Sequence, residues 1–333
     1  MFRKSLMLCA ASLLFAGCGQ TAEDDFREGL PTKEMVAVKE PGGTTSGKSL
    51  EEGEVSAYEL KLGSRSDFYV LTRGATVSVN GGTAFALNLV DEVTKNPPTS
   101  LSGDVAVWGP YTDELSPTTW KLTLTKTAEN SYSYQLEGKA KTAADSEFKI
   151  VLSGTHNIAV DAQGNRLRNY GSGEMKLDWD AAQTLPEHDD DIGTAVIRYS
   201  RPTAEAVATV EADFRNVKDD ERPGTKINAD YRYKETPGAG GEFDFGLNKN
   251  FDSDPGRSAI EHLTIKSRWT QQGAGRADVE ITQGDYLSAS ATLSECWDAN
   301  FNSQFLEASW VPLPVYGGVS ACGSFSTAVY SSL

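Results

Sequence analysis

From about residue 55 to the C-terminus, apolar and polar residues alternate in short runs. Alternation with a period of two is typical of β-strands that bury one face. Such runs begin at Trp120, Tyr132, Phe148, Met175, Ala208, Ile227, Leu263, Ala277 and Leu287. Between them lie turn-forming stretches rich in Gly, Asn and Asp, among them 161–165, 237–241 and 272–275. The pattern predicts a mainly β protein.

The number of runs also predicts the shape of the sheet. Alternation on one side with short connections indicates an antiparallel meander with one dry face. A sheet of roughly ten or more strands does not stay flat, because the twist accumulates from strand to strand. We therefore expect a meander that curls into an open or closed barrel-like sheet. A two-sheet β-sandwich is the alternative.

One segment departs from the alternation and predicts an amphipathic helix over about 83–95. Phe85, Leu89 and Val93 recur at a spacing of four, and Pro97-Pro98 follows them. We expect this helix to begin after Asn80-Gly81-Gly82 and to cover the concave face of the sheet. The predicted architecture resembles the helix-plugged half-barrels of bacterial lipoprotein carriers of the LolA/LolB type. That resemblance lies in the architecture and not in a matched motif.

The first twenty residues have the features of an export signal. Arg3 and Lys4 precede the apolar run Leu6 to Phe15, and Ala16-Gly17-Cys18 follows. Ten residues span about 15 Å as a helix, roughly half of a hydrocarbon core of ~30 Å, which favours a cleaved signal peptide over residues 1–17. The segment from Leu14 to Cys18 resembles the lipobox of bacterial lipoproteins, although Phe15 stands where an aliphatic residue is usual.

The lipobox resemblance implies cleavage before Cys18 and attachment of diacylglycerol to its thiol. Gly19 follows the cysteine instead of the aspartate that resembles an inner-membrane retention signal, which favours the outer membrane, with the domain facing the periplasm or the cell surface. The polar stretch 18–53 is predicted to be a lipidated flexible tether, and 54–333 a single β-rich domain. A plain secretory signal with an incidental cysteine is the alternative.

The remaining cysteines predict a disulfide. Cys9 leaves with the signal peptide and Cys18 carries the lipid, so that Cys296 and Cys322 remain. Two thiols in an oxidising compartment indicate one disulfide. A zinc site is the alternative, but the histidines, which are His156, His188 and His262, show no ligand spacing.

The net charge of the chain indicates which classes of partner it can bind. The net charge is −16, and removal of the signal peptide takes away two basic residues. Such a chain repels phosphate backbones, so no nucleic-acid partner is predicted. No later stretch approaches eighteen apolar residues. The predicted partners are the membrane, through the N-terminal lipid, and an apolar ligand or a surface partner.

The same alternation is also typical of outer-membrane barrels, whose apolar face meets lipid. A tether and lipid anchor would be redundant for such a barrel, and the apolar stripe of the predicted helix needs a dry surface to cover. The apolar series also mixes large and small residues, as interior packing requires. These features favour a tethered domain with its apolar face inside.

Candidate chemistry is sparse. Asp189, Asp190 and Asp191, and separately Asp252 and Asp254, are weak candidates for calcium, because neither group has a fixed ligand spacing. Acidic loop residues are usually just solvated, so no metal and no cofactor are predicted.

Ser153 and His156 lie close in sequence but lack the strand-turn-helix context of a nucleophile. Three functions therefore stay open. The first is a non-enzymatic binding or carrier module for an apolar or amphipathic ligand. The second is a structural or surface-interaction lipoprotein with a packed core, and the third is an enzyme.

The lipobox generates a direct prediction. In cells that express the protein, Cys18→Ser should abolish incorporation of a labelled fatty acid and leave unprocessed or mislocalised chain, because no thiol remains to form the thioether. Metabolic labelling measures this, with the unmodified chain as the control. Label retained by the variant would refute acylation at Cys18.

Overall fold

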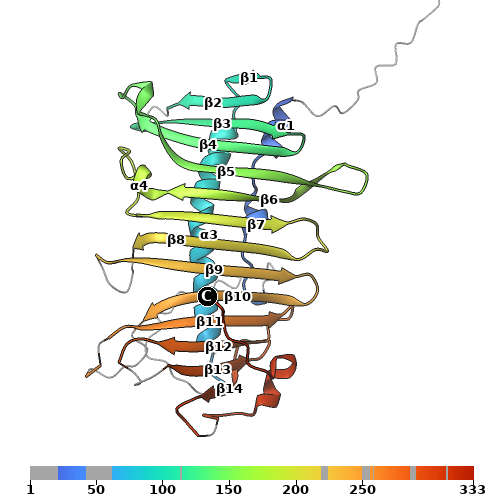
Figure 1. Ribbon diagram of the computed structural model, residues 1–333. Coiled ribbons are helices and arrows are strands. Elements are labelled where there is room, and N and C mark those ends of the chain that lie inside the picture. The colour runs from blue at the N-terminus through green and yellow to red at the C-terminus, as the bar shows by residue number, and fades with distance from the viewer. Residues whose placement is uncertain are drawn as a thin grey trace, which may run out of the picture.

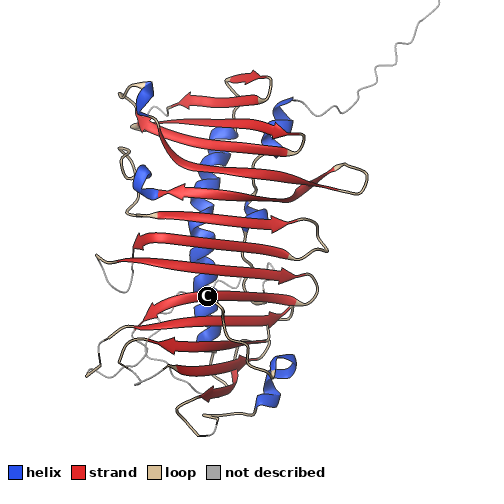
Figure 2. Cartoon of the chain, viewed as in Figure 1, coloured by secondary structure: helices blue, strands red, loops and turns tan. Residues whose placement is uncertain are grey.

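The structure is a computed structural model that describes residues 22–42, 62–112, 115–218, 224–249, 256–257, 259–285, 290–312 and 314–333. Across these residues, fourteen strands form one antiparallel sheet in chain order (Figure 2). The strands are β1 (Ser100–Ser102), β2 (Val105–Tyr111), β3 (Thr118–Ala128), β4 (Ser131–Ala140), β5 (Lys149–Val160), β6 (Arg166–Asp178), β7 (Thr194–Arg201), β8 (Ala208–Lys218), β9 (Lys226–Thr236), β10 (Gly240–Lys249), β11 (Glu261–Thr270), β12 (Gly275–Thr282), β13 (Ala291–Trp297) and β14 (Ser303–Ala308). No pairing joins β1 to β14 among these strands, so the sheet is open. The predicted antiparallel meander is confirmed, and the described strands do not form a sandwich.

The helices lie mainly on one face of this sheet. They are α1 (Ala22–Glu28), α2 (Lys33–Val36), α3 (Asp67–Thr94) and α4 (Trp179–Ala182), with the 3-10 helices η1 (Asp145–Glu147) and η2 (Val319–Phe325). Figure 1 shows α3 crossing behind the strands, with α2 beside it. We call the face toward α3 the inner face and the opposite one the outer face.

The length of α3 matches the width of the sheet that it crosses. Its closest packing is against β11 and β12 near one end and against β2 and β3 near the other. Nine strand spacings from β3 to β12 cover about 43 Å, and the 28 residues of the helix rise about 42 Å. Because α3 contacts the sheet mainly near its two ends, it spans the concave face of the curved sheet from one side to the other.

The predicted helix start is wrong by sixteen residues, because α3 begins at Asp67 and not at about residue 83. Asn80-Gly81-Gly82 therefore lies inside the helix and forms no N-terminus. The hydroxyls of Thr72 and Thr76 are buried and donate to carbonyls four residues earlier. Because these polar residues occupy buried positions of α3, the apolar periodicity of the helix is interrupted there and does not reveal its first half. The side chains of Phe85 and Leu89 lie outside the described residues.

A buried carboxylate fixes the start of α3 to the sheet. Ser66 Oγ accepts a hydrogen bond from the Tyr69 amide at 3.1 Å and donates to Glu295 Oε2 at 2.7 Å. The Phe68 amide also donates to Glu295 Oε2, at 3.1 Å. Glu295, on β13, is 1% exposed. Two otherwise unpaired amides of the first helical turn are thus satisfied, and the helix dipole favours the negative charge there.

The prediction of a flexible tether over 18–53 is wrong for residues 22–42. Five apolar residues of this segment are buried with the core, namely Phe26, Leu30, Met35, Val36 and Val38. Helix α2 packs against α3, β6 and β7. The segment folds because these apolar side chains fill the inner face beside α3. The predicted signal peptide, Cys18 and residues 43–53 lie outside the described residues.

The two faces of the sheet differ as the alternation predicts. Leu122, Leu124 and Leu136 are fully buried on the inner face. Ile150 is an exception, because it is 44% exposed where the pattern places it inside. The register between β4 and β5 shifts at Leu136/Glu137, and a shift of one residue moves a side chain to the other face.

The outer face carries ion pairs that cross between neighbouring strands. Arg198 on β7 contacts Asp213 on β8 at 2.7 Å, and Arg232 on β9 contacts the same carboxylate at 2.7 Å. These two cations hold the pKa of Asp213 below its ordinary value although burial raises it. Further along the sheet, Lys266 contacts Asp244 at 2.8 Å. Opposite charges on adjacent strands favour this register over a slipped one.

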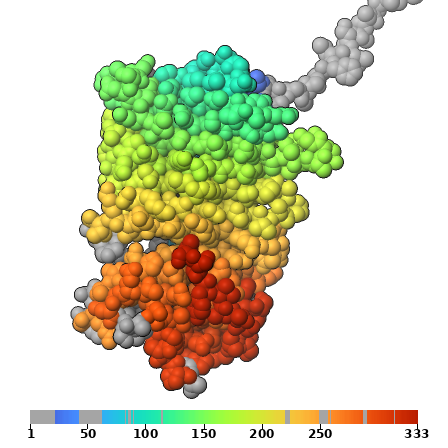
Figure 3. Space-filling view, in the orientation of Figure 1, coloured from blue at the N-terminus to red at the C-terminus, as the bar shows by residue number. Residues whose placement is uncertain are grey.

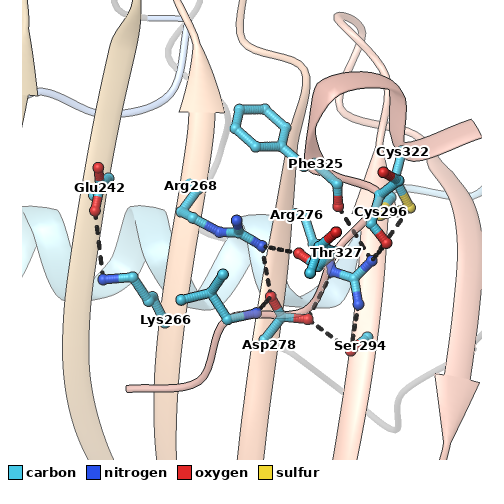
Figure 4. Close-up of polar contacts among 12 residues, drawn as sticks. Glu242, Lys266, Arg268, Arg276, Asp278, Ser294, Cys296, Cys322, Phe325 and Thr327 are labelled. Atoms are coloured by element: carbon cyan, nitrogen blue, oxygen red, sulfur yellow. Dashed lines mark hydrogen bonds and ion pairs between the residues drawn. A yellow bond between two sulfur atoms is a disulfide. The ribbon is translucent and has the colours of Figure 1, made fainter. Parts of the chain in front are cut away.

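The C-terminal segment is fastened to the outer face by buried polar contacts (Figure 4). Arg276, 2% exposed, donates to Asp278 Oδ1 at 2.6 Å and to the carbonyl oxygens of Phe325 and Ser326. The Val329 amide donates to Asp278 Oδ2 at 2.8 Å. The predicted disulfide is confirmed between Cys296 on β13 and Cys322 in η2, with a Cα–Cα distance of 5.4 Å. On β11, Arg268 donates to the Thr327 carbonyl at 2.9 Å, so these contacts bind residues 322–329 across β11 to β13.

We expect reduction of this disulfide to lower the free energy of unfolding. The bridge joins residues 26 positions apart, and loop-closure entropy assigns such a crosslink about 3–4 kcal/mol. Urea denaturation with and without reductant measures the change in midpoint. The variant with both Cys296→Ser and Cys322→Ser is the control, because reductant should not shift its midpoint further. Equal midpoints for the oxidised and reduced protein would contradict the expectation.

The buried Glu295 predicts a pH dependence of stability. Burial, together with Asp67 nearby, raises the pKa of Glu295 to about 7 from its ordinary 4.5, although the bonds from Ser66 and Phe68 lower it. Between these values the folded chain keeps a proton that the unfolded chain loses, so stability falls as pH rises from about 4.5 to 7. The difference amounts to about 3 kcal/mol.

Glu295→Gln keeps the shape and removes this titration. The free energy of unfolding of the variant, relative to that of the unchanged protein, should therefore rise between pH 4.5 and 8. Urea denaturation of both proteins across this range gives the difference, in which other titrating groups cancel. A difference that is constant with pH would show that Glu295 does not titrate as expected.

Candidate functional site

The pairing of β9 with β10 ends partway along both strands. It runs from Gly240↔Thr236 to Phe245↔Tyr231. Beyond that point β9 continues with β8 as far as Lys226, and β10 continues with β11 as far as Lys249. The sheet is therefore split between the ends of β9 and β10.

A bulge in β8 explains why β9 turns away. The register of β8 and β9 shifts between Phe214 and Val217. Asn216 within the bulge has a φ of 55°, and its amide donates to Asn228 Oδ1 at 3.0 Å. A bulge increases the local twist and bends its strand. Asparagine is one of the residue types that tolerate the left-handed region of backbone conformation. Asn216 therefore permits the bulge beside which the two strands separate.

A cavity of about 570 Å³ lies at this split, and residues of both sheet faces line it. Its inner part is lined by Val79 of α3 and by Trp179, Phe214, Tyr231 and Leu247. Its outer part is lined by Asn228, Asp230, Asn248, His262 and Thr264. In Figure 3 the surface is hollowed beside the dark red C-terminal residues. Leu333, the last residue, borders the same cavity.

Aromatic rings form a continuous row along the inner part of the cavity. Trp179 stacks on Phe214 with ring centroids 6.1 Å apart, and Phe214 meets Tyr231 edge-on at 5.5 Å. Tyr231 stacks on Phe243 at 5.9 Å. Aromatic side chains present large rigid apolar surfaces and are frequent in small-molecule sites.

The outer part of the cavity offers polar groups that are mostly neutral or paired. His262 Nδ1 lies 3.0 Å from Asn248 Oδ1, and burial lowers the pKa of His262, so the ring is neutral at pH 7. Asp230 forms an ion pair with Arg215 at 2.7 Å. Asp191 and Lys218 contribute opposite charges at the rim. This arrangement can donate and accept hydrogen bonds without a net charge.

A buried histidine lies apart from the cavity. His156 Nδ1 is 2.9 Å from the Tyr199 hydroxyl, and burial lowers the pKa of His156 to about 4. Ser153 is three positions away on β5, so it lies on the opposite face of the strand. The structure therefore does not bring Ser153 and His156 together, although they lie close in sequence.

The acidic candidates do not form a metal site in the part of the chain that the structure describes. Asp189, Asp190 and Asp191 are exposed, and no group of metal-ligating side chains occurs among the described residues. Asp189 and Asp191 border a second cavity of about 60 Å³. Asp252 and Asp254 lie outside the described residues. The zinc alternative for Cys296 and Cys322 does not hold, because they form a disulfide.

Comparison of the chain with protein-family models, with curated proteins and with solved structures finds no match. Within the described residues, no helix combines the length and apolar character needed to cross a bilayer. The site must therefore be interpreted from its own geometry.

Sequence reasoning missed the cavity, although one signal for it was present. Phe214, Tyr231 and Leu247 follow the alternation like any core residue, so the pattern does not distinguish cavity walls from packed core. The signal was Asn216 near the end of a regular run, because an asparagine there favours a bulge.

Proposed function

We propose that this protein is a membrane-anchored extracytoplasmic lipoprotein that binds an apolar or amphipathic ligand without chemical conversion. The cavity at the β9–β10 split is the observation that carries the proposal. Its volume of about 570 Å³ lies within the range of small-ligand pockets, and its walls combine an apolar inner part with an outer part that carries polar and charged side chains. A structural lipoprotein with a packed core would not need such a space.

The proposed location is the outer membrane, with the domain held by lipid on Cys18 and facing the periplasm or the cell surface. The lipobox-like segment from Leu14 to Cys18 supports this location. The Cys296–Cys322 disulfide adds support, because such bridges persist in oxidising compartments.

Filling the cavity tests the proposal. N-phenyl-1-naphthylamine, an apolar probe that fluoresces when it leaves water, should bind to the full chain. Ala229 lies on the inner side of the cavity, so Ala229→Trp should weaken binding at least about tenfold, a loss of roughly 1.4 kcal/mol.

Ala204→Trp adds the same side chain in an exposed loop and is the matched control, for which we expect unchanged binding. Circular dichroism of both variants verifies that the sheet is intact. If the probe does not bind, or binds Ala229→Trp as well as the unchanged chain, the cavity is not a ligand site.

A further inference from the structure

The cavity passes through the sheet at its split. Successive residues of a strand face opposite sides, yet the cavity contacts Asn228 and Ala229 on β9, and Leu247 and Asn248 on β10. The cavity also contacts Val79 of α3 on the inner side, and His262 and Thr264 on the outer face of β11, which stays paired along this stretch. The missing hydrogen bonds between β9 and β10 beyond Tyr231 leave the opening through which the two sides communicate.

The two sides differ in chemistry. The inner side is formed by Val79 of α3 and the aromatic row, which is mainly apolar and offers no charged side chain. The outer side offers the side chains of Asn228, His262 and Thr264. An occupant that reaches both sides must therefore be apolar at one end and polar at the other, since burying an unpaired polar group is costly.

The charges of the outer side favour an uncharged head. Asp230 is already paired with Arg215, and the lowered pKa of His262 keeps its ring neutral. Asp191 and Lys218 at the rim balance each other in formal charge. An anionic head would meet the carboxylates of Asp191 and Asp230 and an overall charge of −16. A cationic head would meet Lys218 at the rim and Arg215 beside Asp230. A head that uses hydroxyls as donors and acceptors meets neither repulsion.

We propose that the ligand is a single-chain amphiphile with an uncharged polar head, which lies across the sheet at the β9–β10 split. Its alkyl chain lies between α3 and the aromatic row, and its head is bound on the outer face by His262, Thr264 and Asn228. The opening lies between β9 and β10 alone, because β9 stays paired with β8 and β10 stays paired with β11 on either side of it. This inference rests on the proposed function and specifies its ligand.

Three probes that each carry a ten-carbon chain test the selectivity for the head: monodecanoylglycerol, decanoate and decyltrimethylammonium. Displacement of N-phenyl-1-naphthylamine from the full chain measures each affinity below the micellar concentration. We expect the glycerol ester to bind at least about threefold tighter than either charged probe. Equal affinities, or tightest binding of a charged probe, would overturn the assignment of an uncharged head.

Two outer-face variants test the position of the head. Thr264→Val keeps the size and removes the hydroxyl, and His262→Leu removes the ring nitrogens. Each should weaken binding of monodecanoylglycerol about three- to tenfold and leave binding of the headless N-phenyl-1-naphthylamine unchanged. Thr209→Val, on the outer face of β8 away from the cavity, is the matched control and should change neither.

The outcomes separate the two proposals. If N-phenyl-1-naphthylamine binds and Ala229→Trp abolishes binding, but Thr264→Val and His262→Leu leave the glycerol ester unaffected, the cavity binds ligands and the head does not reach the outer face. If none of the probes binds, the proposed function itself is wrong. A loss confined to the glycerol ester in both outer variants supports the amphiphile across the sheet.

Discussion

The structure depends on covering the dry face of an open sheet with a helix of matching length. An antiparallel meander with one apolar face must bury that face, and a sheet that does not close cannot bury it against itself. Helix α3 does this, and it is fixed near both ends. Glu295 binds its first turn, and just beyond its last turn the Trp108 indole donates to the Asn96 carbonyl at 3.0 Å.

A straight helix against a curved sheet leaves space near its middle. The N-terminal segment fills part of that space, where Asn80 of α3 makes two hydrogen bonds with the backbone of Val38. Helix α2 lies between α3 and strands β6 and β7. Near β8 to β10 the space stays open, because the bulge at Asn216 turns β9 away from β10. The candidate site is thus a consequence of the way in which the sheet is covered.

The outer face meets a different requirement, since it must stay polar without pairing with the wrong strands. Cross-strand ion pairs such as Arg198–Asp213 contribute little energy where they are exposed, but their alternation disfavours a slipped register. Asp278 is the exception, because it is fully buried beneath the C-terminal segment with Arg276 and Arg268 as partners. A buried carboxylate requires this many partners, so the covering segment and the charges depend on each other.

The sequence by itself determined which face of most strands is apolar and that Cys296 and Cys322 pair. Alternation is a local property, so Leu122, Leu124 and Leu136 could be placed on the dry face without knowledge of the fold. Tertiary structure decided where α3 begins, that residues 22–42 fold, that Ile150 is exposed, and that a cavity opens between β9 and β10. Each of these depends on contacts between distant residues: Ser66 with Glu295, Val38 with Asn80, and strand registers shifted by bulges. The alternation of apolar and polar residues along the chain contains no information about such contacts, because it reports only on neighbours in sequence.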